Sequence, residues 1–176
     1  MAFADQDTPF TGGRFAGILI GYGVFHFLGA STFIPAIGSL LAFLLIKKLR
    51  PTLADFALCS VSFMVGHAAW IAVGAIVEPQ FLGAVLFDIV VSVLLAIWLL
   101  FRISRAALYG LIAFELLGLL SNAYTMSLLD GWNAQRAALT VHIILRVAVI
   151  GFGLAALHKG LLRREVTDQE SVEVFS

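Results

Sequence analysis

The chain has 176 residues, of which 61% are hydrophobic and only 12% are charged, and its mean hydropathy is +1.01. Globular proteins average roughly 45–50% apolar and about 25% charged residues, so a soluble fold would leave much apolar surface in water. The sequence therefore predicts an integral membrane protein whose outer surface contacts the lipid bilayer. The net charge is zero and the basic residues are scattered, which excludes nucleic acid as a partner.

The first apolar stretch, residues 15–46, is too long for one membrane helix. As a single helix it would extend for about 48 Å, whereas the hydrocarbon core is ~30 Å thick. Thr32 can cap a new helix and Pro35 is tolerated in a first helical turn. We therefore expect two short helices, at 15–30 and 33–48. A re-entrant hairpin or one kinked helix is the alternative for this stretch.

Four later segments each contain enough apolar residues to cross a membrane, which takes about 20. Turn signals separate them, and they cover residues 53–77, 81–102, 106–129 and 137–158. Together with the two short helices, they predict an all-α fold, a polytopic transmembrane bundle of six helices at 15–160, with five helices as the alternative. Residues 1–14 are expected to form an N-terminal polar segment and residues 161–176 a cytoplasmic polar tail.

The basic residues predict the orientation of the bundle, because Lys and Arg collect in short cytoplasmic loops. Of those near the alternating spans, only Arg136 falls on one side. The other side carries Lys47, Lys48, Arg50, Arg102, Arg105, Lys159, Arg163 and Arg164. This bias predicts a cytoplasmic C-terminus. The length and six-helix topology resemble those of several small bacterial membrane proteins, among them the substrate-binding subunits of modular vitamin transporters. We therefore expect a multi-pass protein of the bacterial plasma membrane, that is, the inner membrane. Architecture alone does not identify a function.

Polar residues inside the spans point to the functional site. An ionisable side chain at a helix centre costs ~2.5–3.5 kcal/mol on insertion, so each one needs a partner or a function. The candidate ligand or proton site comprises His67, Asp88, Glu115, Asn122, His142 and Arg146. Counted along their helices, Asp88, Asn122 and His142 share one depth, and the other three lie roughly 4–6 Å deeper. Glu115, Gly118 and Asn122 follow one face of their helix, and we expect such polar and small-residue stripes to face a common interior.

The charges of this layer do not balance. Asp88 and Glu115 are two acids against one permanently charged Arg146, so a proton, a histidinium or a bound cation would restore neutrality. This favours a protein that binds or transports a small solute or protons. Arg146 would be the fixed cation or the anchor of an anionic ligand, either acid the titrating group, and His67 and His142 hydrogen-bonding or proton-relay groups.

Two other functions remain open. If Arg146 simply pairs with Glu115 or Asp88, the polar layer holds the helices together, as in a non-catalytic accessory subunit bound to other membrane subunits. A membrane-embedded enzyme is the third possibility, but the sequence has no catalytic motif. The serines considered as candidate nucleophiles are expected to bond their own i−4 carbonyls instead. They are Ser60, Ser62, Ser92 and Ser121.

Histidine and cysteine give little evidence for a cofactor. His26, His67 and His142 lie on different predicted helices, where imidazoles can bind a metal or haem. They form no His-x-x-x-His pair, and a single membrane histidine more often makes a hydrogen bond between helices. Cys59 is the only cysteine, which excludes an internal disulfide. We therefore assign no metal site and leave the cofactor open.

Overall fold

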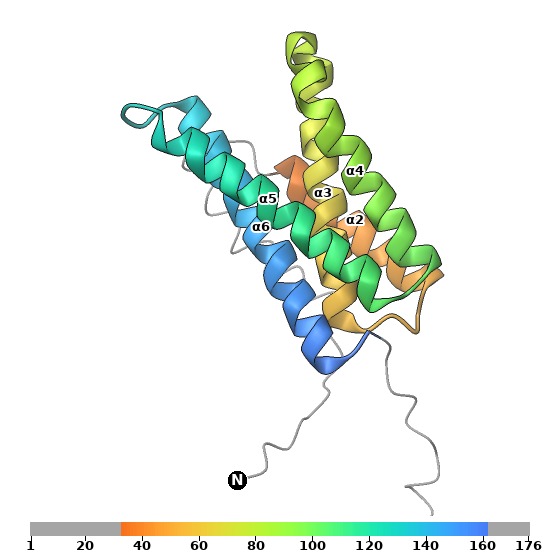
Figure 1. Ribbon diagram of the computed structural model, residues 1–176. Coiled ribbons are helices and arrows are strands. Elements are labelled where there is room, and N and C mark those ends of the chain that lie inside the picture. Colours follow the sequence, from red (N-terminus) through yellow and green to blue (C-terminus); the bar gives the residue numbers. More distant parts are fainter. Residues whose placement is uncertain (1–32, 162–176) are drawn as a thin grey trace, which may run out of the picture.

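Five α-helices and one short 3-10 helix make up residues 33–161, the part of the chain that the computed structural model describes (Figure 1). The elements are α2 (Phe33–Leu49), α3 (Asp55–Val77), η2 (Pro79–Phe81), α4 (Leu82–Phe101), α5 (Arg105–Ser127) and α6 (Ala134–Lys159). The described part contains no strand, so it is all-α as predicted. The helix predicted at 15–30, which includes His26, lies outside the described residues, as does Thr32.

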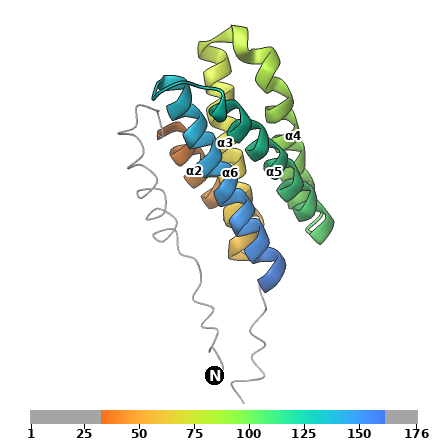
Figure 2. The same cartoon turned by 60° about the vertical axis from the view of Figure 1, so that its left-hand side comes forward.

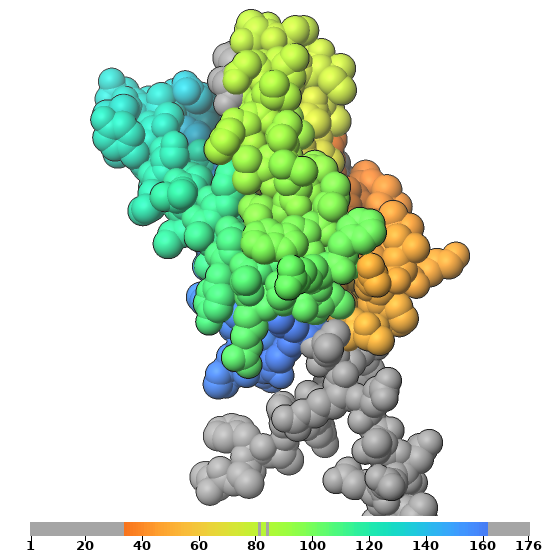
Figure 3. Space-filling model, turned by 45° about the vertical axis from the view of Figure 1, so that its right-hand side comes forward, coloured from red at the N-terminus to blue at the C-terminus, as the bar shows by residue number. Residues whose placement is uncertain are grey.

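Three of these helices are long and apolar enough to cross a membrane, namely α3, α5 and α6. In α4, a shorter apolar stretch covers Val85–Phe101. Large apolar side chains of α4 and α5 are exposed on the outer face of the bundle (Figure 3). They include Leu86, Phe87, Leu94, Leu117 and Leu120. An apolar outer surface of this kind is consistent with a helical membrane protein.

The centre of the bundle is α3, which packs against α2, α4 and α6, while α5 packs mainly against α6 (Figures 1 and 2). In α3, 67% of the apolar window is buried by the rest of the protein, against 22% in α5. The side chains that fill this core include Phe43 of α2, Phe63 of α3 and Leu145 of α6. The α3 helix is therefore enclosed by protein, whereas α5 keeps one side on the outer surface.

Glycine allows α2 and α3 to cross at close range. A Cβ atom on Gly66 would lie 2.0 Å from the Ser39 Oγ and 2.6 Å from the carbonyl oxygen of Pro35. On the facing helix, a Cβ atom on Gly38 would lie 3.3 Å from the Cα of Gly66. Small residues let helix backbones approach in this way in membrane proteins. The Gly66 position therefore fixes how α2 lies on α3.

The boundaries of α5 and α6 are set by side-chain caps. The Ser104 Oγ accepts a hydrogen bond from the Ala107 N–H at 3.2 Å, and the Asn133 Oδ1 accepts one from the Arg136 N–H at 2.8 Å. Both residue types are favoured N-caps because they pair with amides that have no partner within the helix. The last helix begins at Ala134, three residues before the predicted apolar span at 137–158, because Asn133 caps it there.

One of the serines links two helices. The Ser62 Oγ donates to the Leu58 carbonyl at 2.7 Å, which confirms the predicted i−4 bond. The Ser60 Oγ instead donates to the Val149 carbonyl of α6 at 2.8 Å, so the same prediction was wrong for Ser60. The Ser60 side chain faces the neighbouring helix and thereby holds α3 against α6.

We expect the substitution Gly66→Ala to lower stability by about 1–3 kcal/mol, because the added methyl group overlaps backbone and side-chain atoms of α2. The control is Gly74→Ala on the same helix, where an added Cβ meets no atom within 4 Å among the described residues. Thermal unfolding of the purified proteins in detergent measures the difference. Equal melting temperatures for the two variants would show that α2 and α3 do not cross as closely as described.

Candidate functional site

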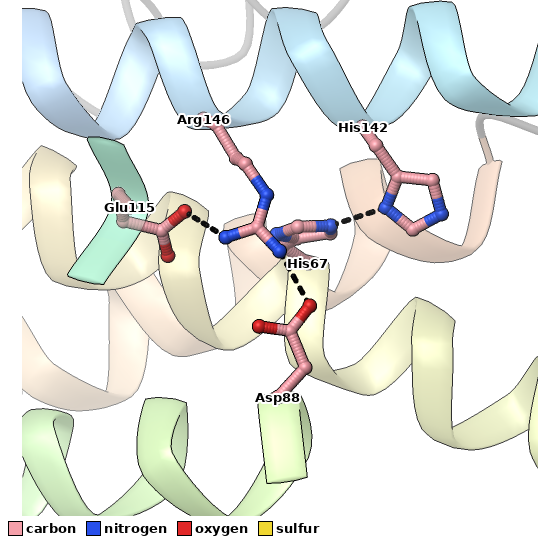
Figure 4. A network of polar contacts seen from close by, with 5 residues as sticks. All are labelled: His67, Asp88, Glu115, His142 and Arg146. Carbon is pink, nitrogen blue, oxygen red and sulfur yellow. Dashed lines mark hydrogen bonds and ion pairs between the residues drawn. The ribbon is translucent and has the colours of Figure 1, made fainter. Parts of the chain in front are cut away.

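Five of the six predicted site residues meet inside the bundle (Figure 4). Each of four helices contributes to this polar cluster: α3 supplies His67, α4 supplies Asp88, α5 supplies Glu115, and α6 supplies His142 and Arg146. In α6, His142 and Arg146 are four residues apart and therefore share one face of the helix. The predicted stripes thus face one interior, as expected from their helical spacing.

The centre of the cluster is the guanidinium of Arg146. Its Nη1–H donates to the Glu115 Oε2 at 2.8 Å, and its Nη2–H donates to the Asp88 Oδ2. The sequence left open which acid would pair with Arg146, and in the structure both do. Arg146 and Glu115 are buried, whereas the Asp88 side chain is 26% exposed. The ion pairs therefore join α4, α5 and α6 around one cation.

Gly118 makes room for this cation. A Cβ atom at Gly118 would lie 2.2 Å from both the Cζ and the Nη1 of Arg146. The Phe114 ring, one turn earlier on α5, has its centroid 5.9 Å from the Arg146 Cζ. The sequence placed Gly118 on the interior stripe of its helix but gave no sign that a guanidinium lies against it. Phe114 was missed altogether, because an aromatic residue in an apolar run has no distinguishing feature.

The two histidines hydrogen-bond to each other. The His67 Nε2 and the His142 Nδ1 are 2.6 Å apart, so one ring donates and the other accepts. The ring of Trp70 lies beside that of His142, with 4.6 Å between their centroids. His67 is buried and His142 is partly buried. The pair therefore forms a second polar contact, between α3 and α6, next to the Arg146 ion pairs (Figure 4).

Asn122 does not join the ion pairs, although the sequence analysis included it in the site. It lies on α5 one turn beyond Gly118, and its buried Nδ2 has no hydrogen-bond partner in the part of the chain that the structure describes. The Glu115 Oε1 and the Arg146 Nε also lack partners there. Buried polar atoms in proteins nearly always have one, so these three need an explanation.

No family model, no curated protein and no solved structure matches this chain. Function is therefore inferred from the cluster itself. Within residues 33–161, no three His, Cys, Asp or Glu side chains are placed to hold a metal ion, and His26 lies outside that range. With both acids ionised, the Arg146 centre carries one net negative charge. Such a centre can hold one proton or another monovalent cation.

We expect Arg146→Met to lower stability by about 3–5 kcal/mol, because it leaves Asp88 and Glu115 close together without their cation. Adding Asp88→Asn and Glu115→Gln to this variant should recover most of the loss, since neutral amides replace the unpaired charges. Thermal unfolding in detergent measures both steps. If the triple variant were as unstable as Arg146→Met, Arg146 would stabilise the bundle by packing and not by charge.

A second prediction concerns the glycine beneath the guanidinium. Gly118→Ala should displace Arg146 from its two acids and lower stability by about 1–3 kcal/mol, because the new methyl group overlaps the guanidinium. Gly151→Ala on α6 is the matched control, since an added Cβ there meets nothing within 4 Å in the described part of the protein. Chemical denaturation should separate the two variants. If Gly118→Ala were as stable as Gly151→Ala, the guanidinium could not lie against position 118 as described.

Proposed function

We propose that this chain is a membrane protein that binds and transports protons through the centre formed by Asp88, Glu115 and Arg146. One observation carries the proposal: two carboxylates bond to one guanidinium in the interior of the bundle. With both acids ionised, one negative charge has no counter-charge in the described part of the centre. Such a charge is expensive at membrane depth, so binding of one cation is favoured.

The geometry favours a proton over a metal cation or a larger solute. Transporters that bind sodium commonly use carbonyls freed where a helix is unwound. Here α4, α5 and α6 run unbroken past the cluster, so their carbonyls stay within helical hydrogen bonds. Glu115 is also fully buried, which leaves little space for a solute beside it. A proton needs neither extra ligands nor a cavity.

The two acids differ in access. Asp88 is partly exposed and Glu115 is not, so Asp88 is nearer to the outside of the cluster. His67 and His142 form a contact of 2.6 Å that can pass a proton between two rings. We therefore assign Asp88 and Glu115 as the exchanging acids, Arg146 as the fixed cation, and the histidine pair as the adjoining relay.

We further propose the full topology: six helices, a multi-pass location in the bacterial inner membrane, and a cytoplasmic C-terminus. Support comes from the basic residues at the ends of the helices. Lys47 and Lys48 lie in the last turn of α2 and Arg50 follows that helix. Arg102 follows α4, Arg105 begins α5, and Lys159 ends α6. These three regions lie at the same end of the bundle (Figure 1), and an excess of Lys and Arg marks the cytoplasmic side.

A second candidate function is an accessory subunit of a larger membrane complex, as the sequence allowed. The observation that favours it is the double bonding of Arg146, which ties α4 and α5 to α6. A cation bonded on two sides can act purely as a structural link. In that case the cluster would contribute to stability, and the function would lie on the outer surface of the bundle.

Proton flux into liposomes distinguishes the two candidates. Purified protein is reconstituted with a pH-sensitive dye inside the vesicles, and a pH gradient is imposed. We expect flux in the wild type and a fall to the level of protein-free liposomes in Asp88→Asn and in Glu115→Gln. Glu78→Gln is the control, because this exposed acid lies between α3 and α4, away from the cluster.

Melting temperatures of the same samples complete the test. Flux that disappears in either cluster variant while the protein remains folded supports proton transport. Wild-type vesicles that leak no faster than empty ones, together with lower melting temperatures for both variants, would contradict transport and favour the accessory subunit.

A further inference from the structure

Three buried polar atoms belong to residues at the contact between Arg146 and α5. They are the Glu115 Oε1, the Asn122 Nδ2 and the Arg146 Nε, and none has a hydrogen-bond partner among the described residues. Glu115 and Arg146 are almost completely buried, with 0% and 2% of their surface exposed. The ion pairs already described use other atoms of these two side chains. The part of the chain that the structure describes therefore offers these three atoms no hydrogen-bond partner.

The residues that carry these atoms follow one line along the interface of α5 and α6. Gly118 lies against the Arg146 guanidinium, with Glu115 three residues before it and Asn122 four residues after it on the same face of α5. The helices α5 and α6 are antiparallel neighbours (Figure 1). Since Gly118 lies against Arg146, helical spacing puts Asn122 at the level of His142, one turn from Arg146 toward the connection at 128–133. The line therefore runs from that end of the bundle inward to Glu115.

The chemistry of the three atoms selects their ligand. The Asn122 Nδ2 and the Arg146 Nε are donors, whereas the ionised Glu115 Oε1 is an acceptor. A cation would suit the carboxylate oxygen but not the two donors, and an anion would suit only the donors. Water both donates and accepts, and buried water typically makes about three hydrogen bonds to polar groups that otherwise lack partners.

We infer that ordered water molecules lie in the α5–α6 interface beside the Arg146 guanidinium and connect Asn122 to Glu115. This deepens the proposed function and rests on it, because these waters form the path by which Glu115 exchanges its proton. Toward the opposite end the interface is closed by fully buried apolar side chains, including Leu108, Leu111 and Val149. In the conformation described, the water path therefore leads from Glu115 toward the 128–133 end.

Other ionisable groups near this path come from each neighbouring helix. In the described part of the chain, Asp88 of α4, His67 of α3, and His142 and Arg146 of α6 face the centre. Asp88 offers the rival path, because its partly exposed carboxylate bonds to the same guanidinium as Glu115. A test of the water path must therefore separate Asn122 from Asp88.

Infrared spectroscopy of the full chain in membranes provides that test. The neutral carboxyl of Glu115 is identified as the C=O stretching band that Glu115→Gln removes, and its shift after rapid mixing with D2O gives the exchange rate. We expect Asn122→Leu to slow this shift by about tenfold or more, because an apolar side chain no longer holds water at the entrance. Ser121→Leu, the same change at the exposed neighbouring position, should leave the rate unchanged.

The conservative variant Asn122→Ser keeps a hydrogen-bonding group and should exchange at the wild-type rate, which separates loss of water from a packing defect. Exchange at the wild-type rate in Asn122→Leu would overturn the path. Slow exchange in Asp88→Asn, together with wild-type exchange in Asn122→Leu, would assign the path to Asp88 instead. If no carboxyl band depends on Glu115 at any pH, Glu115 does not bind the proton and the path fails. A Glu115 band whose exchange depends on Asn122, in a protein without flux, supports the path and refutes transport only.

Discussion

The double ion pair of Arg146 is the constraint on which the polar interior depends. A guanidinium stays charged at all physiological pH values, so it can lie inside an apolar bundle only if acceptors surround it. Glu115 of α5 and Asp88 of α4 provide them. The α4 helix packs against α3 and α5, and it reaches α6 through the bond from Arg146 to Asp88. One side chain of α6 therefore fixes the depth and rotation of two other helices.

A buried ion pair is weak evidence that a protein needs it for stability, because apolar residues of similar volume often serve as well. The composition of this cluster is a further argument against a purely structural role. A second acid adds a charge that one arginine cannot balance, and a second pair of polar rings lies beside it. A structural link would be complete with Arg146 and one acid. In the proposed function, the extra acid is the group that allows the centre to bind a proton.

Periodicity and depth predicted much of the fold, but they could not predict the pairings. Hydropathy located the apolar helices, and the spacing of Glu115, Gly118 and Asn122 predicted their shared face. Depth counted by helical rise separated His67 from His142 by roughly 4–6 Å, whereas their ring nitrogens are 2.6 Å apart. Long side chains and inclined helices can bring two side chains into contact although their positions along the helices differ in depth. Spacing likewise could not show that Arg146 bonds to both acids, because that depends on how α4 and α5 are rotated about their own axes.

Glycine explains why the cluster lies at this depth. Toward the basic end of the bundle the helices pack closely, and a Cβ atom on Gly153 of α6 would lie 2.9 Å from the Ile112 Cγ1 of α5. Beyond the cluster the α3–α4 and α5–α6 hairpins diverge (Figures 1 and 2). The charged centre occupies the boundary between these regions, where Glu115 is enclosed and Asp88 is still 26% exposed. A site at this boundary is partly exposed on one side, while close packing separates it from the basic end, so the proposed transport requires a second conformation in which that packing opens.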